Sequence, residues 1–417
     1  MSSGARTLIQ ADDLTGAADT AVAFAAAGER TVVLPWTGGA VADRLERALA
    51  ELEPVALALD CASRDLDAGE AARRARELAS THGAEEPTCV YKKVDSVLRG
   101  HPAAELHALL EGLGAARSVV IAPAYPALGR TTIDARQLVD GRPLAGPDLP
   151  SLFELDPASV RLVSLAELRS GLVLDERPGF AVVDADLTED LDLLAAALER
   201  LERLPLLVGS GGLAAAVAAR RRYGAGETDP CEPPSGRRLV VSVSRTAAAV
   251  SQLERLGELL PELVDARISV ATLARDERAW LGEVERAAAL VRDALETGAD
   301  VLLGVAGAAP EELGSAATRD LINDSLERTL AGALSGHRPD LIVASGADSA
   351  LAVCAALGVE ALVVERALPH GAVQSATYGR PDPPLAIVTK SGGFGGPEAL
   401  AELCGALRPE PARSGAR

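Results

Sequence analysis

Short, continuous apolar runs alternate with amphipathic helical stretches along almost the whole chain. Runs that are apolar at every position are typical of strands that helices cover on both faces of a parallel sheet. The alternation of strand and helix therefore predicts an α/β fold with a mostly parallel sheet. In the first half the runs are Thr7–Ala11, Thr31–Leu34, Val55–Leu59, Thr88–Lys92, Ser118–Ala122, Phe180–Val183 and Leu206–Gly209, separated by helical stretches such as Ala17–Ala27, Val41–Leu52, Gly69–Ala79 and Leu187–Leu204.

A stretch rich in proline and glycine divides this pattern into two parts. Residues 224–236 contain three prolines and three glycines, which can continue neither a helix nor a central strand. We therefore expect two α/β domains, 1–225 and 237–417, joined by a linker over 226–236. The second domain repeats the pattern with the runs Leu239–Val243, Ile268–Thr272, Val301–Val305, Leu341–Ala344, Ala361–Val364 and Leu385–Thr389.

Composition excludes several classes of protein. The 417 residues carry 41 Lys and Arg against 60 Asp and Glu, a formal net charge of −19, so a nucleic-acid partner is not expected. Aromatic residues make up only 2%, so the core must consist of Ala, Val and Leu. No apolar stretch approaches the roughly 20 residues that span a bilayer, and the first residues do not resemble a signal peptide. We expect a soluble, cytoplasmic protein that has no membrane partner.

Cysteine and histidine spacing argues against a metal centre held by the protein. The five cysteines are scattered and never form CxxC, and the five histidines form no HxH or HxxxH pair. Buried thiols and ordinary imidazoles explain these positions better than disulfides or a zinc site. We therefore expect no residue to be a metal ligand of that kind.

Polar side chains follow four of the predicted strands in the first domain. In open parallel sheets, ligands bind at the carboxyl ends of the strands, so these residues predict a polar pocket on one edge. The segments are Asp12-Asp13-Leu14-Thr15-Gly16, Asp60 with Ser63-Arg64, Lys92-Lys93-Val94-Asp95-Ser96-Val97-Leu98-Arg99-Gly100-His101, and Ala122-Pro123-Ala124-Tyr125-Pro126.

Some of these residues also have a structural explanation. Asp13 can cap the helix that follows it, because an aspartate accepts hydrogen bonds from the first free N–H groups. One cap does not account for Asp12, Asp13 and Thr15 together, so we favour a ligand-binding role for the aspartate pair.

The charged block after the fourth strand has two interpretations. Lys92 and Lys93 could be ordinary solvated charges, but at a strand end beside Asp95 they favour an anionic ligand. The planar guanidinium of Arg64 or Arg99 suits two-pronged binding of a carboxylate.

Three turns rich in glycine and hydroxyl residues follow strands of the second domain. Backbone N–H groups in such turns form anion sites at helix N-termini, which suits nucleotide phosphates. The turns match neither GxxxxGK[ST] nor a dinucleotide GxGxxG. They read Val243-Ser244-Arg245-Thr246, Ala344-Ser345-Gly346-Ala347-Asp348-Ser349 and Thr389-Lys390-Ser391-Gly392-Gly393-Phe394-Gly395-Gly396.

Taken together, these segments resemble the four-carbon acid sugar kinase family. The resemblance runs in order over nearly the whole chain and is carried by the aspartate pair, the Lys92–His101 block, the Ala122–Pro126 segment and Lys390-Ser391-Gly392-Gly393-Phe394-Gly395. Members have an N-terminal sugar-binding domain and a C-terminal nucleotide-binding domain. The resemblance implies ATP-dependent phosphorylation of the terminal hydroxyl of threonate, erythronate or an oxo-tetronate, across a cleft between the domains.

The resemblance also assigns roles to residues. Asp95 or Asp12 would orient the reacting hydroxyl, Lys390 would meet the phosphates, and Mg²⁺ would enter with ATP through one carboxylate and several waters. The substrate would be bound by Asp12, Asp13, Ser63, Arg64, Lys92, Asp95, Ser96 and Arg99. ATP would be bound by Ser244, Thr246, Gly346, Ala347, Asp348, Ser349, Lys390, Gly392 and Gly393.

The sequence departs from the family pattern around Ser244. The usual Gly-Ser-x-Ser-x-x-Thr-x-x-Gln is replaced by Val243-Ser244-Arg245-Thr246-Ala247-Ala248-Ala249-Val250-Ser251-Gln252. A regulatory or non-catalytic protein that binds an acidic metabolite and a nucleotide therefore stays open. A Mg²⁺-dependent lyase would leave the glycine-rich second domain unexplained. Homo-oligomerisation stays open too.

Overall fold

The structure is a computed structural model that describes residues 5–38, 41–79, 87–114, 117–221, 236–273, 276–307 and 316–405. The chain divides into two compact units. The first runs to residue 228 and also contains Ala361–Arg366, and the second contains the remainder. The first unit thus takes in a short segment from the part of the chain that we expected in the second domain. Apart from Gly236, the expected linker lies outside the described residues.

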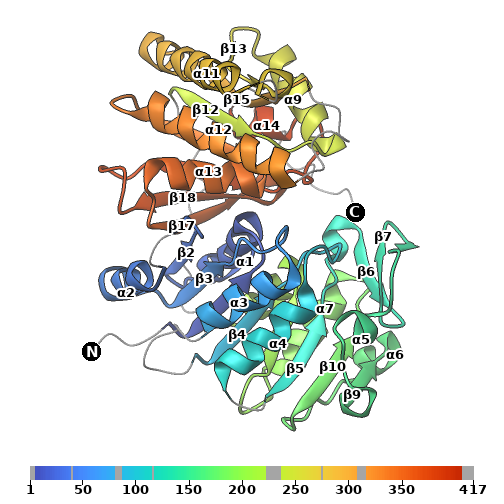
Figure 1. Cartoon of the computed structure of the whole chain (residues 1–417). Helices are drawn as coiled ribbons and strands as arrows, with labels where there is room; N and C mark the ends of the chain where they lie inside the picture. The colour runs from blue at the N-terminus through green and yellow to red at the C-terminus, as the bar shows by residue number, and fades with distance from the viewer. Residues whose placement is uncertain are drawn as a thin grey trace, which may run out of the picture. The chain divides into compact units, whose positions relative to one another are not determined.

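The first unit is built on a mostly parallel sheet in the order β17-β2-β3-β1-β4-β11-β5-β10-β9 (Figure 1). β17 alone among these strands is antiparallel, and it pairs Leu362 with Val33 of β2. The register places Ala11 opposite Asp60 and Lys93, so β1, β3 and β4 end level with one another. The strands are β1 (Thr7–Ala11), β2 (Thr31–Leu34), β3 (Ala56–Asp60), β4 (Cys89–Lys93), β5 (Ser118–Ala122), β9 (Val160–Val163), β10 (Gly179–Val183), β11 (Leu206–Gly209) and β17 (Ala361–Leu368).

Helices cover both faces of this sheet. α3 and α4 pack together on one face, and α1, α8 and α7 pack in a row on the other. Many of their inward side chains are alanines, so they approach the sheet closely, and the core on the α4 side is formed largely by Val, Leu and Ile. The helices are α1 (Leu14–Ala26), α2 (Val41–Leu52), α3 (Ala68–Ala79), α4 (Pro102–Leu113), α7 (Thr188–Leu198) and α8 (Gly211–Arg220).

A small antiparallel sheet is inserted between β5 and β10, where the sequence analysis named no element. Its first turn is held by Asp184, whose carboxylate accepts from the backbone N–H groups of Asp134 and Ala135 at 2.9 Å each. These strands are short and partly exposed, so they lack the continuous apolar runs that identified the main sheet. The inserted elements are β6 (Arg130–Ile133), β7 (Arg136–Val139), β8 (Arg142–Pro143), α5 (Leu149–Leu152) and α6 (Leu165–Arg169).

The second unit is a second α/β layer with the strand order β13-β15-β12-β16-β19-β18. Its strands are parallel except β18, which pairs antiparallel with β19 at the edge. β14 pairs separately with β15. The strands are β12 (Arg238–Ser242), β13 (Val264–Asp265), β14 (Ile268–Ser269), β15 (Val301–Ala306), β16 (Leu341–Ser345), β18 (Ala372–Tyr378) and β19 (Ala386–Lys390).

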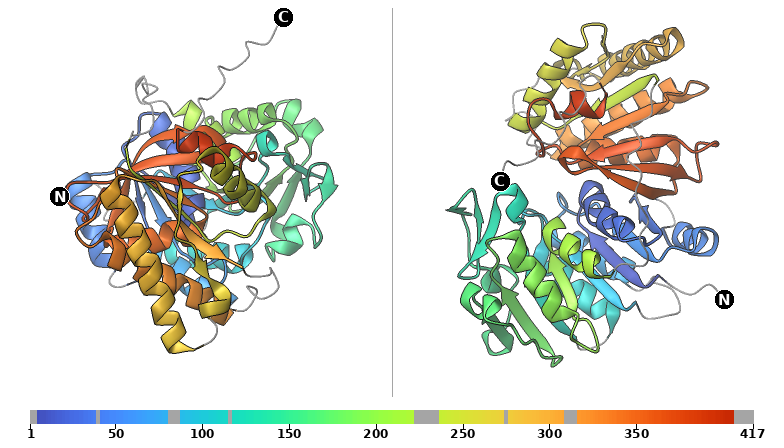
Figure 2. Two further views of the ribbon diagram at one scale, coloured as in Figure 1. Left: turned by 90° about the horizontal axis from the view of Figure 1, so that it is seen from above. Right: turned by 180° about the vertical axis from the view of Figure 1, so that it is seen from behind.

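Helices α11, α12 and α13 pack in sequence on one face of this sheet (Figure 1), and α9 and α14 pack together on the other (Figure 2). The core beneath α9 and α14 contains Val240, Leu256, Val388 and Leu400. The helices are α9 (Ala247–Leu259), α10 (Val270–Leu273), α11 (Glu277–Thr297), α12 (Ala316–Leu334), α13 (Ala347–Leu357) and α14 (Ala399–Leu403).

The prediction of a two-domain α/β fold with mostly parallel strands layered with helices is confirmed. One predicted strand was wrong in part: in the run Ile268–Thr272 only Ile268–Ser269 is a strand, and Val270 begins the short helix α10. β18 was missed because polar residues such as Gln374, Ser375 and Thr377 interrupt its apolar residues, so it has no continuous apolar run. Among the described residues, no helix is both long enough and apolar enough to span a membrane.

Candidate functional site

Three buried aspartates gather at the carboxyl ends of β1 and β4 around one arginine. Arg64 donates from Nε to Oδ2 of Asp12 at 2.7 Å and from Nη2 to Oδ1 of Asp12 at 2.9 Å. Its Nη1 donates to Oδ2 of Asp13, and Nη2 lies 3.9 Å from Oδ1 of Asp95. We call Asp12, Asp13, Arg64, Asp95 and Arg99 the carboxylate–guanidinium cluster. The structure brings together residues that lie far apart in the sequence, as the strand-end argument predicted.

Arg99 completes the cluster from the solvent side. It donates from Nε and Nη2 to the two oxygens of Asp95, at 2.8 and 2.9 Å. The Arg99 side chain is 56% exposed, whereas that of Asp95 is only 10% exposed. A guanidinium in this position remains accessible to an incoming anion even while it holds Asp95.

The two arginines keep Asp12 and Asp95 ionised. Burial alone would raise both pKa values, but the Arg64 guanidinium lowers the pKa of Asp12, and the Arg99 hydrogen bonds together with the Arg64 charge lower that of Asp95. Burial and the neighbouring Asp12 charge raise the pKa of Asp13. Asp12 and Asp95 are therefore hydrogen-bond acceptors that do not readily take a proton.

Local backbone geometry holds the cluster in place. Asp13 is the N-cap of α1, and its Oδ1 accepts from the backbone N–H of Gly16 at 2.5 Å. The helix-capping and ligand-binding interpretations of Asp13 are thus compatible, because its second oxygen faces Arg64. Gly100 has a φ of +85°, so any other residue there would be strained, and the missing side chain leaves its backbone in ordinary contact with Asp12 and Arg64.

Two of the expected substrate-binding residues lie in the interior. The side chain of Lys92 is fully buried, and its ammonium pairs with Glu105 of α4 at 2.5 Å. Ser63 is also fully buried and donates to the other oxygen of Glu105 at 2.5 Å. The Lys92 charge is therefore neutralised beneath the loop that carries Arg64, and in our proposal both residues support this loop. Ser96 is buried at the end of β4, and its carbonyl accepts from Gln137 at 2.9 Å.

Adjacent lysines of β4 face opposite sides of the sheet, so Lys93 lies on the α1 side. Its Nζ donates to the carbonyl of Val94 at 2.9 Å and would lie 3.1 Å from a Cβ at Gly16. The neighbouring aspartate on α1 is Asp19, whose pKa is raised to about 6 by burial.

Asp60 lies at the end of β3 and is buried. Its carboxylate accepts from the backbone N–H of Ala62 at 2.7 Å, and burial raises its pKa to about 7.

The turn that follows β11 was not predicted from the sequence. Ser210, Gly211 and Gly212 begin α8 beside α1, and a Cβ at Gly211 would come 2.5 Å from Oδ2 of Asp19 and 2.7 Å from Tyr125. The run Leu206–Gly209 was predicted as a strand, so the rule that ligands bind at strand ends would also have indicated the residues that follow it. Asp19 gave no such signal, because it lies inside the helical pattern.

In the second unit the three glycine and hydroxyl turns meet around Ser244. A Cβ at Gly392 would come 2.4 Å from Oγ of Ser244. A Cβ at Gly346 would come 3.5 Å from Cβ of the same serine. Gly346 has a φ of +100°, and its backbone N–H donates to the carbonyl of Lys390 at 2.8 Å. The ends of β12, β16 and β19 thus form one compact, glycine-lined surface.

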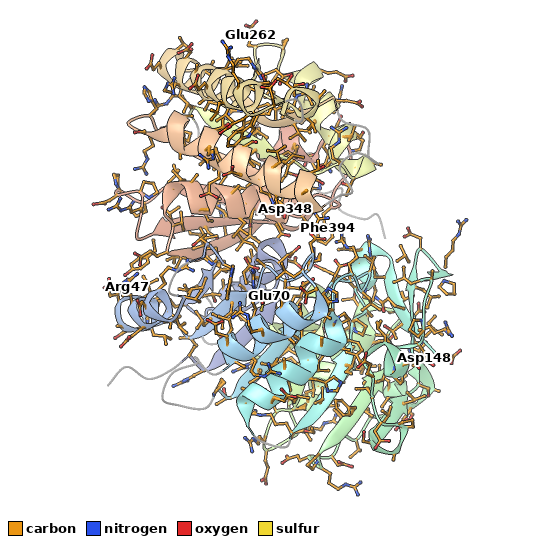
Figure 3. The ribbon with its side chains drawn as sticks, viewed as in Figure 1. Arg47, Glu70, Asp148, Glu262, Asp348 and Phe394 are labelled. Carbon is orange, nitrogen blue, oxygen red and sulfur yellow. The ribbon has the colours of Figure 1, made fainter. Side chains whose placement is uncertain are left out.

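Hydroxyl side chains join these turns. Thr246 caps α9, because its Oγ1 accepts from the backbone N–H of Ala249 at 3.2 Å. The same hydroxyl donates to the carbonyl of Gly392 at 3.1 Å. Ser349 is fully buried and accepts from the backbone N–H of Val243 at 3.0 Å. Ala347 and Asp348 form the first turn of α13, so their backbone N–H groups belong to the amino end of a helix (Figure 3 labels Asp348 and Phe394).

Lys390 is buried beneath the glycine-rich loop 391–396 and holds it from within. Its Nζ donates to the carbonyls of Ser391 and Phe394, at 2.8 and 2.7 Å, and burial lowers its pKa to about 8. Gln252 of α9 donates to the carbonyls of Phe394 and Gly395 at 2.9 and 3.0 Å. Gly393 lies in the same loop, with open space where a Cβ would be.

Two family descriptions match the two units. The sugar-binding N-terminal domain matches residues 7–217, and the nucleotide-binding C-terminal domain matches residues 239–400. A D-threonate kinase of Cupriavidus necator is 34% identical, with 94% of this chain and 96% of that protein covered. A D-threonate kinase of Bordetella bronchiseptica is 32% identical (96% and 97% covered), and a 3-oxo-tetronate kinase of Pseudomonas fluorescens is 28% identical (95% and 96% covered).

Solved structures of bacterial proteins share this fold. A protein of Salmonella typhimurium LT2 aligns with a TM-score of 0.74 at 19% identity, covering 97% of this chain and 98% of that one. A Haemophilus influenzae protein aligns with a TM-score of 0.65 at 20% identity, covering 95% and 99%. At this level of identity the two structures support the fold alone.

Proposed function

Because the chain belongs to the four-carbon acid sugar kinase family, we propose that it transfers the γ-phosphoryl group of ATP to the terminal hydroxyl of D-threonate or a closely related acid sugar. The observation that carries the proposal is the carboxylate–guanidinium cluster, which lies within the part of the chain that matches a sugar-binding domain. A cluster of this kind offers donors to a carboxylate and acceptors to several hydroxyls, which are the groups of an acid sugar. Three relatives named D-threonate kinase support the choice of D-threonate as the first substrate to test.

We assign the substrate carboxylate to Arg99 and the hydroxyls to the aspartates. Arg99 is the exposed guanidinium of the cluster, and two-pronged contact with a carboxylate suits its planar group. Asp12, Asp13 and Asp95 would accept hydrogen bonds from substrate hydroxyls with the lone pairs that Arg64 and Arg99 leave available. Ser96, at the end of the same strand, would add a hydroxyl.

The phosphates of ATP would bind to the turns around Ser244. Backbone N–H groups at the start of α9 and α13 favour anions, and Gly346 and Gly392 let the backbone approach closely. Lys390 would act by holding loop 391–396 in shape and by adding positive charge beneath it. Phosphoryl transfer depends mainly on such positioning and charge neutralisation.

Mg²⁺ would enter bound to the nucleotide. The described residues include no group of three or more His, Cys, Asp or Glu side chains arranged to hold a metal ion. A hard divalent ion usually takes one or two carboxylates together with phosphate oxygens and water. Asp348, in the first turn of α13, is the carboxylate that we assign to it.

A release assay for ADP tests the proposed function. The purified chain is incubated with ATP, Mg²⁺ and each of D-threonate, L-threonate, D-erythronate, L-erythronate and their 2- and 3-oxo forms. We expect turnover with at least one of these and the highest kcat/KM with D-threonate. ADP release that none of these compounds stimulates would contradict the proposal.

A further inference from the structure

The reacting hydroxyl loses a proton during phosphoryl transfer, and the aspartates of the cluster are poorly suited to accept it. Both oxygens of Asp12 accept from Arg64, and both oxygens of Asp95 accept from Arg99. In Asp13, one oxygen accepts from Gly16 N and the other from Arg64. A carboxylate held by guanidinium groups, as in Asp12 and Asp95, is a weak base. Asp13 has a raised pKa, but both of its oxygens already accept hydrogen bonds.

Asp19 differs from these aspartates in its contacts. It lies on α1, half-buried, and within the part of the chain that the structure describes its carboxylate makes no hydrogen bond and no ion pair within 4 Å. Its Oδ2 is directed toward the amino end of α8, where Gly211 has no Cβ that would block it. The aromatic ring of Tyr125 adjoins the same point.

Asp19 is directed toward the edge of the sheet that carries the carboxylate–guanidinium cluster. Side chains of an α-helix point toward its N-terminus, so Asp19 is directed from the second turn of α1 toward the end that Asp13 caps. Tyr125 follows β5 and Gly211 follows β11, and both strands end on the edge that carries the cluster. The absence of a Cβ at Gly211 therefore lets the Asp19 carboxylate and the Tyr125 ring pack against the amino end of α8, on the edge of the sheet that carries the cluster.

We propose that Asp19 is the catalytic base of the kinase reaction. This inference rests on the proposed function. In the step, the substrate hydroxyl oxygen forms a bond to the γ-phosphorus while the bond from the γ-phosphorus to the β,γ-bridging oxygen breaks. The electron pair of the broken bond leaves with ADP, and the hydroxyl proton moves to a carboxylate oxygen of Asp19.

The surroundings of Asp19 are consistent with a base that works near neutral pH. Burial raises its pKa to about 6, the positive charge of Lys93 opposes that rise, and the negative charge of Asp13 adds to it. Tyr125, on the α8 side, has its own pKa raised by burial and by the Asp19 charge and therefore stays neutral. A carboxylate with a pKa just below the working pH is ionised yet still basic enough to accept a proton.

The test compares Asp19→Asn with wild type and with Asp192→Asn, a control at an exposed aspartate on α7. We expect Asp19→Asn to lower kcat by about 100-fold or more while the KM values for acid sugar and ATP stay within about threefold. Asp192→Asn should match wild type. Asp19→Glu, which restores a carboxylate one methylene further out, should recover part of kcat.

The pH dependence of kcat distinguishes a catalytic base from a residue that has only a structural role. The wild-type kcat should fall tenfold per pH unit below about pH 6, and the small residual kcat of Asp19→Asn should lack that limb. Three results would overturn the proposal: a wild-type kcat that is flat from pH 5 to 8, a kcat of Asp19→Asn within twofold of wild type, or an Asp19→Asn variant that melts well below wild type and binds D-threonate no longer. A wild-type chain that phosphorylates no acid sugar would instead refute the proposed function, and the inference with it.

Discussion

Arg64 contacts Asp12 through two parallel hydrogen bonds, from Nε at 2.7 Å and from Nη2 at 2.9 Å, and donates to Asp13 with its remaining nitrogen. One guanidinium thus pairs with two buried carboxylates that follow the same strand. Its side chain is only 16% exposed. This geometry makes Arg64 important both for the stability of the first unit and for the shape of the proposed sugar site.

Arg64→Lys should therefore affect both folding and substrate binding. A lysine keeps one charge but cannot donate along the two parallel directions or reach Asp13 at the same time. Breaking a buried pair costs about 3–5 kcal/mol when one partner is removed, so we expect Arg64→Ala to lower the melting temperature by several degrees and Arg64→Lys by less. Thermal unfolding measures this, and equal melting temperatures for all three proteins would contradict it.

Arg99→Lys should change substrate binding with little effect on stability. The Arg99 side chain is more than half exposed, and a lysine keeps one positive charge beside Asp95, so the loss of stability should be small. Loss of the two-pronged contact should raise the KM for the acid sugar strongly and the KM for ATP much less. Steady-state kinetics with each substrate varied in turn tests this. A lower melting temperature with wild-type kinetics would mean that the Arg99–Asp95 pair is only structural.

Lys390→Met should weaken ATP binding and leave acid-sugar binding intact. Methionine fills most of the space but removes the two hydrogen bonds to the carbonyls of Ser391 and Phe394 that hold the glycine-rich loop. Calorimetric titration with ATP and with D-threonate separates the two effects. Unchanged ATP affinity together with normal turnover would exclude Lys390 from the nucleotide site.

Gly392→Ala should also impair ATP use, for a steric reason. The new Cβ would come 2.4 Å from Oγ and 2.9 Å from Cβ of Ser244, so one of the two turns must move. Gly396→Ala is the matched control, since it lies in the same loop with nothing within 4 Å of its Cβ. We expect a higher KM for ATP in Gly392→Ala alone. Equal effects of both substitutions would show that the close approach to Ser244 is unimportant.

Asp60 should make the stability of the protein depend on pH. Burial raises its pKa to about 7 in the folded chain, against about 3.9 unfolded. The folded state therefore binds more protons between these values, and the contribution of Asp60 to stability, complete below pH 4, is lost as the pH rises toward 7. Asp60→Asn should lose less stability than wild type between pH 4 and 7 in urea unfolding. Parallel curves for the two proteins would contradict this.

The sequence predicted most of the main sheets because buried parallel strands are continuous apolar runs. The predicted ends of β3, β4 and β12 lie within one residue of the ends in the structure. In each case a polar residue follows the predicted apolar run and marks its end. The elements between β5 and β10 were not predicted, because their short strands depend on partners such as Asp184 and not on a local pattern.

The members of the carboxylate–guanidinium cluster could be predicted from the sequence. The hydrogen bonds and ion pairs between them could not. Strand order brings Asp12, Arg64 and Asp95 to one edge, and the sequence indicates that much. Whether adjacent lysines face ligand or core depends on which face of β4 each occupies, so the burial of Lys92 against Glu105 could not be read from the sequence. Asp19 could not be predicted either, because the residue it faces, Gly211, lies on α8, far from it in the sequence.

Identification of the reaction product tests the central claim most directly. D-threonate is incubated with the chain, Mg²⁺ and ATP labelled at the γ-phosphate, and the product is examined by mass spectrometry and ³¹P NMR. We predict a phosphomonoester on the terminal carbon, formed in a one-to-one ratio with ADP. ADP formed without a labelled acid sugar, or no reaction with D-threonate and the other four-carbon acid sugars, would contradict the account.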